Sequence, residues 1–505
     1  MTDTRVPTDS LGNPITVPDS DDVLVVEATD GSRWELVCGL EVHAELATVT
    51  KMFSGAPNSF GDDPNTNVDP VTLGLPGTLP VVNERAVELA IRFGSAIGAE
   101  IRRSVFSRKN YFYPDMPKNF QISQYDLPIV VGGALELPGG HVVEVERAHL
   151  EEDTGKSSHV GGDGRIAGAA YSLIDYNRAG VPLLEIVSRP HVRSAEQARQ
   201  YVAELRAILV ACGVSDGKME EGSLRVDANI SVRREGTDEL RTRCEIKNVN
   251  SLRSLVRAIE FEAARQADLH AAGEPVVQST RGWDEATGTT VLMRTKEDAD
   301  DYRYFPEPDL VPVDPDPAWV EAIAASLPLL PAARRERLAA RTGAARTDES
   351  VVAVVDRGQD DQAVAAIEAG ADGARVLVHV TQNLAGEGGA ALDPGRLAEL
   401  VRLETGGELT ATQAKQVLAE LVADPTATAA EVAAAKGFEA MDTGALEAVV
   451  DEVIASNPDE WTTFTSGDPK ARGKLTGFFI GQVMKATKGQ ADGKLATQLL
   501  NQKAG

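Results

Sequence analysis

A carboxylate and an imidazole lie two residues apart near the start of this chain, in the run Gly39-Leu-Glu-Val-His43. Apolar and polar residues alternate from Leu36 to Leu46, which indicates a strand with one buried face. Since alternate side chains of a strand share a face and each residue rises about 3.3 Å, Glu41 and His43 should project together about 6.6 Å apart. That arrangement suits two ligands of one metal ion, although acidic and histidine side chains on any solvated strand face would give the same pattern.

A second alternating run, at 224–233, indicates another strand packed on one side, with Arg225, Asp227 and Asn229 on its polar parity. The wider inventory of acidic candidates adds Glu151, Glu152, Asp175, Glu185, Glu220 and Glu221. Carboxylate oxygens are the ligands that Mg²⁺ prefers, and Mg²⁺ binds through one or two of them together with substrate phosphates. Taken singly, each of these residues also fits ordinary surface charge.

Glycine-rich nucleotide-binding loops are absent from the sequence. Gly155-Lys-Ser157 ends like a phosphate-binding loop, but Leu150 occupies the position of the required first glycine. No dinucleotide fingerprint follows a strand, and the protein-kinase motifs are missing. Any nucleotide chemistry must therefore use another type of site.

The elements that position these residues indicate an α+β fold. A helix is predicted after a Ser194/Gln197 capping box and ends near Gly213, and a second helix is predicted after Ser251. Strands and helices alternate irregularly from about 31 to 320, which does not favour a doubly wound parallel sheet. We expect a mixed or antiparallel β domain with helices, followed by all-α regions.

Composition shifts divide the chain of 505 residues into several regions. The acidic segment 1–30 is predicted to be a mobile extension, and 31–320 the main α+β domain. A proline-rich stretch after Pro306 leads into a helical domain at 321–434, and Asp424-Pro425 marks a joint before a small helical tail at 435–505.

Bulk properties exclude several protein classes. The formal charge of −27 argues against indiscriminate nucleic-acid binding. The last 36 residues form a local exception, because they are rich in lysine and arginine: Lys470, Arg472, Lys474, Lys485 and Lys488. No apolar run approaches the roughly 20 residues of a membrane helix. Three scattered cysteines argue against a disulfide framework, and we expect a cytoplasmic protein without membrane contact.

Several ordered blocks resemble the GatB family, the B subunits of the aspartyl/glutamyl-tRNA(Asn/Gln) amidotransferases. They are Tyr113-Pro-Asp-Met-Pro-Lys-Asn119, His149-Leu-Glu-Glu-Asp-Thr-Gly-Lys-Ser157, Asp175-Tyr-Asn-Arg178, Met219-Glu-Glu-Gly-Ser223, Glu245-Ile-Lys-Asn-Val-Asn-Ser251 and Tyr302-Arg-Tyr-Phe305. The resemblance covers nearly all of the chain after residue 30. It implies a cradle-shaped N-terminal domain, a helical middle and a tail related to the YqeY proteins.

The resemblance also implies an activity and partners. A protein of this family uses ATP and Mg²⁺ to phosphorylate the side-chain carboxylate of mischarged Asp-tRNA(Asn) or Glu-tRNA(Gln). Ammonia that the amidase (glutaminase) subunit releases from glutamine then displaces the phosphate, and the small C subunit completes the heterotrimer. A noncatalytic tRNA-binding scaffold in the same complex is the main alternative, and an isolated small-molecule ligase is a third.

Motif matching then assigns candidate roles. Glu41, His43 and Glu152 are expected to bind the metal ion and to act in catalysis, and Glu151 is the near alternative to Glu152. Asp175 is a further catalytic candidate. ATP is expected to meet Lys109, Lys118, Asn177, Arg225, Asp227, Asn229 and Lys247, although the sequence does not show which lysines meet ATP and which meet tRNA. The five basic tail residues are expected to bind tRNA.

One segment departs from the family pattern. Many relatives carry a four-cysteine zinc site, whereas the corresponding positions here are Ser54, Ala56, Asp69 and Thr72. Because the thiolates are gone, we predict no structural zinc. The aromatic residues Trp283, Tyr302, Tyr304 and Phe305 fit either core packing or stacking on an unpaired RNA end.

Overall fold

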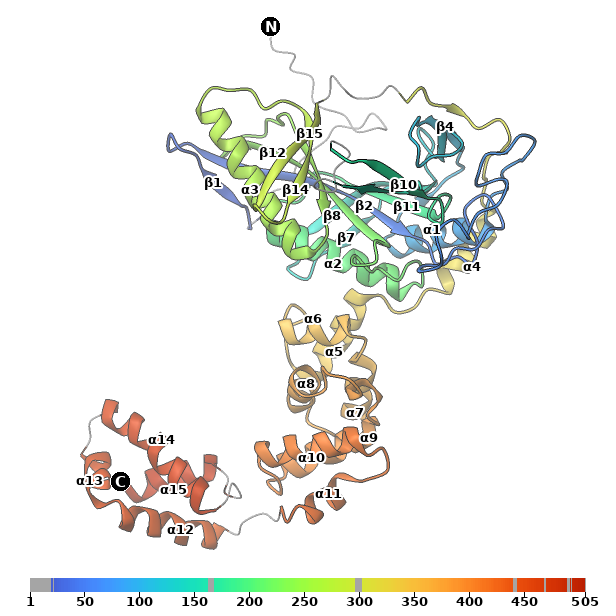
Figure 1. Ribbon diagram of the computed structural model, residues 1–505. Coiled ribbons are helices and arrows are strands. Elements are labelled where there is room, and N and C mark those ends of the chain that lie inside the picture. Colours follow the sequence, from blue (N-terminus) through green and yellow to red (C-terminus); the bar gives the residue numbers. More distant parts are fainter. Residues whose placement is uncertain are drawn as a thin grey trace. The chain divides into compact units, whose positions relative to one another are not determined.

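The computed structural model describes residues 20, 22–161, 168–295, 302–438, 443–466, 469–487, 491 and 493–504. The chain divides into two compact units, Met1–Pro331 and Ala332–Gly505, which are described separately (Figure 1). Among the described residues, no helix is long and apolar enough to cross a membrane.

The first unit is built on a large, mainly antiparallel sheet. Its strands follow the order β15-β14-β13-β12-β2-β11-β8-β5-β4-β16, and only β13 and β14 pair in parallel along this path. The strands of the path are β2 (Arg33–Glu45), β4 (Ser107–Asn110), β5 (Phe120–Ser123), β8 (Val142–Glu152), β11 (Pro182–Ser188), β12 (Leu224–Arg234), β13 (Cys244–Val249), β14 (Ser279–Asp284), β15 (Thr289–Thr295) and β16 (Phe305–Pro306). Short strands at the margins are β1 (Val25–Glu27), β3 (Glu100–Ile101), β6 (Val130–Val131) and β7 (Ala134–Glu136), while β9 (Lys156–Val160) and β10 (Tyr171–Asp175) form a separate hairpin.

Strand β2 lies at the centre of this path, and its register places the polar residues in cross-strand rows. His43 is opposite Arg225 on β12 and Glu185 on β11, and Glu185 is opposite His149 on β8. Directly opposed residues project from the same face of a sheet. The alternation seen in the sequence therefore produces one continuous charged face across four strands.

The other face of the sheet carries the hydrophobic core. Leu40 and Val42 are fully buried there, together with residues of the helices α1 (Glu84–Ala96), α2 (Ala195–Ala211) and α3 (Leu252–Ala271). The predicted helix after Ser194 is confirmed as α2, and the Ser194 hydroxyl accepts a hydrogen bond from the backbone N–H of Gln197. The full capping box is wrong, because the Gln197 side-chain oxygen accepts from the backbone N–H of Arg193 instead.

Truncation of Leu205 tests this core. The side chain is fully buried on α2, so Leu205→Ala is expected to lower the free energy of unfolding of the first unit by about 2 to 5 kcal/mol. Urea denaturation followed by tryptophan fluorescence would measure the loss. A change below about 1 kcal/mol would contradict the packing described here.

Two predicted boundaries differ from the structure. Strand β1 pairs with β2 and Ala28 is buried, so the first domain begins before residue 31. Residues 1–19 and 21 lie outside the described part, and the predicted mobility of the extension stays a prediction there. At the other end, α4 (Pro317–Ala325) packs on α1, and Leu330 still contacts the first core. Apolar side chains that continue past the proline-rich stretch hold this segment to the first unit.

Helices make up the described part of the second unit. They are α5 (Pro331–Thr342), α6 (Glu349–Asp356), α7 (Asp360–Glu368), α8 (Gly373–Gln382), the short 3₁₀ helix η2 (Gly389–Ala391), α9 (Pro394–Thr405), α10 (Ala411–Ala423), α11 (Ala429–Ala435), α12 (Thr443–Ser456), α13 (Pro458–Thr465), α14 (Pro469–Ala486) and α15 (Gly493–Ala504). The predicted α+β domain followed by helices is confirmed.

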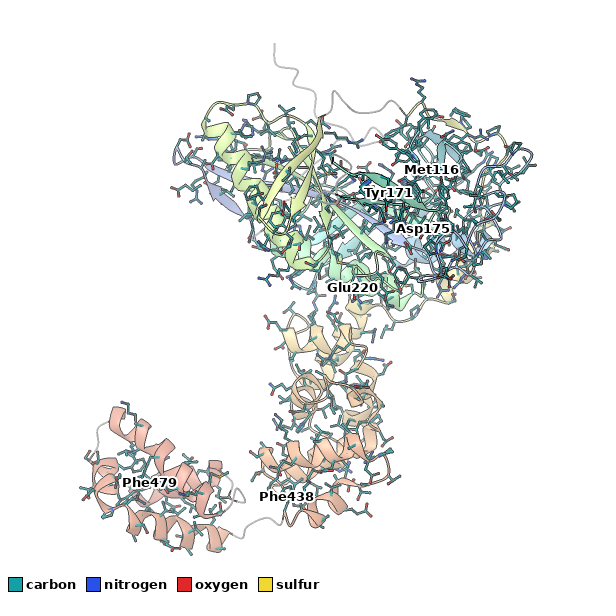
Figure 2. All side chains as sticks on the ribbon, in the orientation of Figure 1. Met116, Tyr171, Asp175, Glu220, Phe438 and Phe479 are labelled. Carbon is teal, nitrogen blue, oxygen red and sulfur yellow. The ribbon has the colours of Figure 1, made fainter. Side chains whose placement is uncertain are left out.

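Two separate hydrophobic cores lie within the second unit. One contains buried residues from Leu338 to Ala433, and the other contains residues of α12 to α15, including the fully buried Phe464 and Phe479. Figure 2 labels Phe479 of the second core and Phe438, which packs against the first. Asp424-Pro425 lies within the first of these cores, because α11 follows it and packs on α9 and α10. The predicted bounds of the helical domain and the tail stay a prediction.

Candidate functional site

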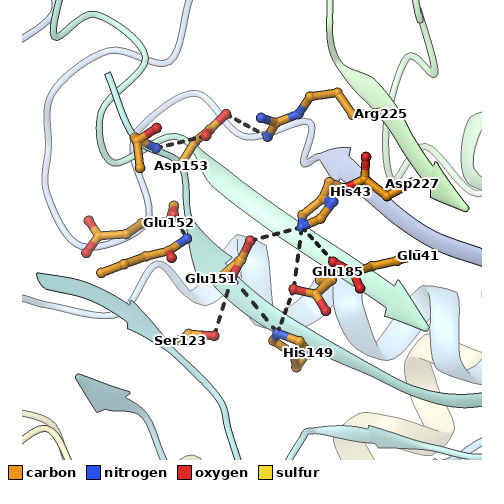
Figure 3. A network of polar contacts seen from close by, with 12 residues as sticks. Glu41, His43, Ser123, His149, Glu151, Glu152, Asp153, Glu185, Arg225 and Asp227 are labelled. Atoms are coloured by element: carbon orange, nitrogen blue, oxygen red, sulfur yellow. Dashed lines mark hydrogen bonds and ion pairs between the residues drawn. The ribbon is translucent and has the colours of Figure 1, made fainter. Parts of the chain in front are cut away.

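His43 is surrounded by carboxylates from three strands. Its Nε2 lies 3.4 Å from Glu185 Oε2, 3.5 Å from Glu151 Oε1 and 3.9 Å from Glu41 Oε1 (Figure 3). The His43 side chain is 16% exposed and that of Glu41 25%, while Glu151 is almost fully buried. The predicted position of Glu41 and His43 on one face is therefore correct, and both side chains keep some exposure to solvent.

The group extends across β12 and β13. Asp227 is opposite Glu41 in the register, and Lys247 Nζ lies 2.6 Å from Asp227 Oδ2 and 3.0 Å from Glu245 Oε1. Two sets of ligand atoms lie close enough to hold a metal ion, namely Glu41, His43 and Asp227, and His43, Glu151 and Glu185. Since they share His43, these two sets form one continuous site, which we call the His43 cluster.

The charges of this cluster are strongly coupled. Burial opposes protonation of His43, but the hydrogen bond to Glu185 and the charges of Glu185, Glu151 and Glu41 outweigh it and raise the pKa of His43 to about 9. Burial and the nearby Glu185 raise the pKa of Glu41 to about 7, whereas His43 lowers it. Despite its burial, Glu185 has a pKa well below the usual value because His149 and His43 stabilise its charged form.

The donor set fits a hard divalent cation. Four carboxylates and one imidazole converge, and oxygen-rich ligand sets suit Mg²⁺ or Mn²⁺. Burial is the main cause of the raised pKa of Glu41, and the charges of Glu185 and Asp227 add to it, while His43 and Lys247 act in the opposite direction. Additional positive charge at this point would relieve the repulsion between these carboxylates.

Glu152 lies apart from this group, which corrects its expected place beside Glu41 and His43. It follows Glu151 on β8 and so belongs to the opposite parity of the strand. Its carboxylate lies 2.5 Å from Lys118 Nζ and accepts the backbone N–H of Ile122, and Figure 3 shows it directed away from His43. Glu152 and Lys118 thus form a buried ion pair, and the alternative, Glu151, takes the place beside His43.

Asp175 and Asn177 also lie in a different network. The carboxylate of Asp175 accepts the backbone N–H groups of Asn65 and Asn177, and the Asn177 side chain bonds the backbone of Asn67 and Asp63. Both residues connect the 63–67 loop to the segment after β10. The structure does not bring them to His43.

The remaining ATP candidates are divided between the charged face and its margin. Asn229 lies two residues from Asp227 on the same parity of β12. Arg225 is opposite His43, but its guanidinium lies 2.8 Å from Asp153. Lys109 Nζ lies 4.8 Å from the centre of the Tyr302 ring. Although burial lowers the pKa of Lys109, Glu151 and the other nearby negative groups outweigh it and raise the pKa, so Lys109 and Lys247 supply positive charge at the two sides of the cluster.

Comparison with known families identifies the chain's family. The model described as the GatB/GatE catalytic domain matches residues 36–321, which include every residue of the His43 cluster, and the model of the GatB domain matches residues 366–504. The chain belongs to the GatB family. As a member, it is part of a tRNA-dependent amidotransferase, a ligase that uses glutamine as the amide donor.

Similar proteins match along almost the whole chain. The aspartyl/glutamyl-tRNA(Asn/Gln) amidotransferase B subunit of Anaeromyxobacter sp. (strain K) is 50% identical over 494 residues, covering 94% of this chain and 99% of that relative. The protein of the same name from Nocardia farcinica is 49% identical over 488 residues, covering 93% and 96%. That from Picosynechococcus sp. is 45% identical over 499 residues, covering 95% and 99%.

The segment that departs from the cysteine pattern is held by hydrogen bonds in this GatB-family chain. The hydroxyls of Ser54 and Thr72 lie 3.2 Å apart, and the backbone N–H of Thr72 donates to Asp69 at 2.7 Å. Ala56 is buried, and its carbonyl accepts the backbone N–H of Lys51. Hydrogen bonds within its turns thus hold this loop. The absence of zinc stays a prediction.

The aromatic candidates separate into two environments. Trp283 is 6% exposed, packs against Phe261 and donates to Glu285, so core packing describes it. Tyr304 stacks on Tyr125 beside Lys109, and Phe305 is exposed. Stacking on RNA stays a prediction for this second group.

The tail candidates are only partly described. Lys474 and Lys485 are exposed on α14, whereas Arg472 lies over the ring of Phe464. The side chain of Lys470 and all of Lys488 lie outside the described residues. The described exposed pair is 11 residues apart, which is close to three helical turns and places both on one side of α14.

Sequence reasoning did not assign several residues that the structure places in or near the site. His149 lies 3.3 Å from Glu185, and Glu245 completes the contacts of Lys247. Glu185 belongs to the acidic candidates, but no motif gives it a specific role. The signal for Glu185 and His149 was strand parity, which places His149 with Glu151, but their contact with His43 depends on strand order.

Proposed function

We propose that the His43 cluster activates the side-chain carboxylate of mischarged Asp-tRNA(Asn) or Glu-tRNA(Gln) by ATP-dependent phosphorylation. Ammonia derived from glutamine then replaces the phosphate and forms Asn-tRNA(Asn) or Gln-tRNA(Gln). One observation carries the proposal: His43 and carboxylates from four strands converge on the charged face of the sheet. Phosphoryl transfer depends mainly on alignment and charge neutralisation, which such a cluster supplies.

Individual residues receive roles from their positions. Glu41, His43, Asp227, Glu151 and Glu185 would hold Mg²⁺, which would neutralise phosphate charge when bound. Lys109 and Lys247 flank the cluster and would attract the phosphates of ATP, and Asn229 would add a polar contact. Arg225 holds Asp153 and lies beside His43, so it orients the neighbouring strand end.

The partners follow from the same proposal. The chain would assemble in the cytoplasm with the amidase (glutaminase) subunit, which releases ammonia from glutamine, and with the small C subunit. Lys474 and Lys485, with Lys470, Arg472 and Lys488, would contact the tRNA phosphates. The direct test is amide formation on Asp-tRNA and Glu-tRNA by the assembled enzyme, with ADP release measured in the same reaction. Amide formation without ADP release would contradict the proposal.

Metal binding is expected to strengthen with rising pH. In the metal-free protein His43 carries a proton below about pH 9, and only the neutral imidazole can bind a metal ion. Mn²⁺ affinity should therefore rise from pH 7 to pH 9, by up to about tenfold per pH unit, and level off above pH 9. Protonation of Glu41, with its pKa of about 7, should weaken binding further below pH 7.

Isothermal titration of the free protein with Mn²⁺ would measure this dependence. The His43→Gln variant provides the control, because it lacks the titrating imidazole and should lose the rise between pH 7 and 9. Equal affinity of the unmodified protein at pH 7 and pH 9 would exclude His43 as a ligand.

A further inference from the structure

Lys51 is a fully buried lysine outside the His43 cluster. Its side chain is 0% exposed, and Nζ donates to the carbonyl oxygens of Ala179 at 2.6 Å and Tyr176 at 3.3 Å. No carboxylate of the described residues lies within ion-pair distance of Nζ. Removal of a charge from water costs several kcal/mol unless polar groups compensate. A lysine in this position therefore needs a structural or functional reason.

The surroundings of Lys51 have opposite effects on its charged form. Burial lowers the pKa of Lys51 to about 8, while Asp69, Glu152 and Asp175 act in the opposite direction. The ammonium thus lies among three carboxylates that are bound elsewhere, and its direct partners are the backbone carbonyls of a single segment. That segment, 176–181, follows β10 and leads into β11.

The backbone around Lys51 is built against the same segment. The N–H of Met52 donates to the carbonyl of Gly180 at 2.8 Å. Gly180 has a φ of +83°, and a Cβ atom there would lie 3.3 Å from Cδ of Lys51. Glycine at 180 therefore both adopts the left-handed conformation and leaves room for the lysine side chain.

The segment held by Lys51 leads to the His43 cluster by two routes. Arg178 donates to the carbonyls of Thr154 and Gly155 and lies 3.4 Å from Asp153, which in turn contacts Arg225 opposite His43. Along the chain, the segment continues directly into β11. That strand carries Glu185, 3.4 Å from His43.

We propose that Lys51 is a positioning residue for the amidotransferase reaction: its buried ammonium fixes the 176–181 segment and thereby the placement of Glu185 and of the Arg178, Asp153 and Arg225 chain beside His43. This inference rests on the proposed role of the His43 cluster. Lys51 itself touches no residue of that cluster. Its effect on catalysis would pass through the backbone of the segment that it holds.

The substitution Lys51→Met tests the proposal in the assembled amidotransferase, because methionine keeps most of the side-chain volume and removes the charge. We expect kcat for amide formation to fall at least about tenfold, since small displacements of aligned groups cost such factors. KM for the mischarged tRNA should change less than about threefold, and glutamine hydrolysis by the partner enzyme should be retained. Hydrogen exchange of the backbone amides of residues 177–181 in the free protein should accelerate.

Two further variants separate positioning from stability. Leu205→Ala destabilises the first unit through α2 without contacting the 176–181 segment, and it should keep kcat at a temperature where the protein is folded. Gly180→Ala keeps the Lys51 charge and disturbs the 176–181 segment directly, both through its left-handed backbone and by crowding the Lys51 side chain, so it should reproduce the loss of kcat. If Lys51→Met does not fold, native kcat in Gly180→Ala would overturn the proposal, and a loss of kcat there but not in Leu205→Ala would support it.

Native kcat in Lys51→Met, or an equal loss in Leu205→Ala, would overturn the proposal. Unchanged hydrogen exchange at residues 177–181 in Lys51→Met would do the same. Failure of the proposed function has a different signature: Glu41→Gln would then keep amide formation, whatever the result for Lys51→Met.

Discussion

Replacement of Glu41 by Gln is expected to abolish amide formation on mischarged tRNA, with a loss of at least about 10²- to 10³-fold in kcat. The amide keeps the shape of the side chain and removes one carboxylate from the His43 cluster, where Glu41 lies 3.9 Å from His43 and opposite Asp227. The lost charge would weaken metal binding and the alignment of the phosphate groups. A coupled assay of ADP release and amide formation would measure the effect.

The same variant distinguishes a catalytic protein from a scaffold. Glutamine hydrolysis and tRNA binding should remain, because Glu41 belongs to neither function in this proposal. Stability at neutral pH should be equal or slightly higher, since burial and Glu185 already raise the pKa of Glu41 and so penalise its charged form. Lost tRNA binding together with normal ADP release would favour the scaffold instead.

Glu151 and Glu152 are expected to respond to the same substitution in opposite ways. Glu151→Gln removes a carboxylate 3.5 Å from His43, and we expect at least about a 100-fold loss of kcat with less than about 1 kcal/mol change in the free energy of unfolding. Glu152→Gln leaves Lys118 buried and without its charge partner. We expect it to lower the free energy of unfolding by about 3 to 5 kcal/mol.

Parallel urea denaturation and turnover measurements on both variants would compare the two carboxylates. The double variant Glu152→Gln with Lys118→Met serves as a control, because it removes both charges and should recover part of the lost stability. If Glu152→Gln left stability unchanged and removed activity while Glu151→Gln stayed active, the assignment of the two residues would be reversed.

The local features of the site could be predicted from the sequence. Glu41 and His43 are two residues apart in a strand, and side chains two residues apart point to the same face. Their common face could therefore be predicted from the sequence alone. The same reasoning placed Arg225, Asp227 and Asn229 together on β12, and the cap at Ser194 was visible from its residue type. The motif order supported the family.

Other features could not be read from residue order. Glu151 and Glu152 are consecutive residues of β8, so their side chains point to opposite faces of the sheet. Motif matching does not show which of these faces carries His43. Asp175 was assigned to the site by its motif alone, yet its carboxylate accepts the backbone N–H of Asn65 in the 63–67 loop. No local pattern marks Lys51 as buried, because its burial depends on the distant 176–181 segment.

The sequence by itself determined the two strands that carry Glu41, His43 and Asp227, the helices after Ser194 and Ser251, and the order of an α+β part and helical parts, because these depend on side-chain periodicity and local hydrogen bonding. Only the tertiary structure decided which polar residues meet. Strand order places β2 between β11 and β12 and brings Glu185, Glu151 and Asp227 to His43 from positions more than 100 residues away in the chain. Such contacts arise from sheet pairing and burial over the whole domain, and no short segment specifies them.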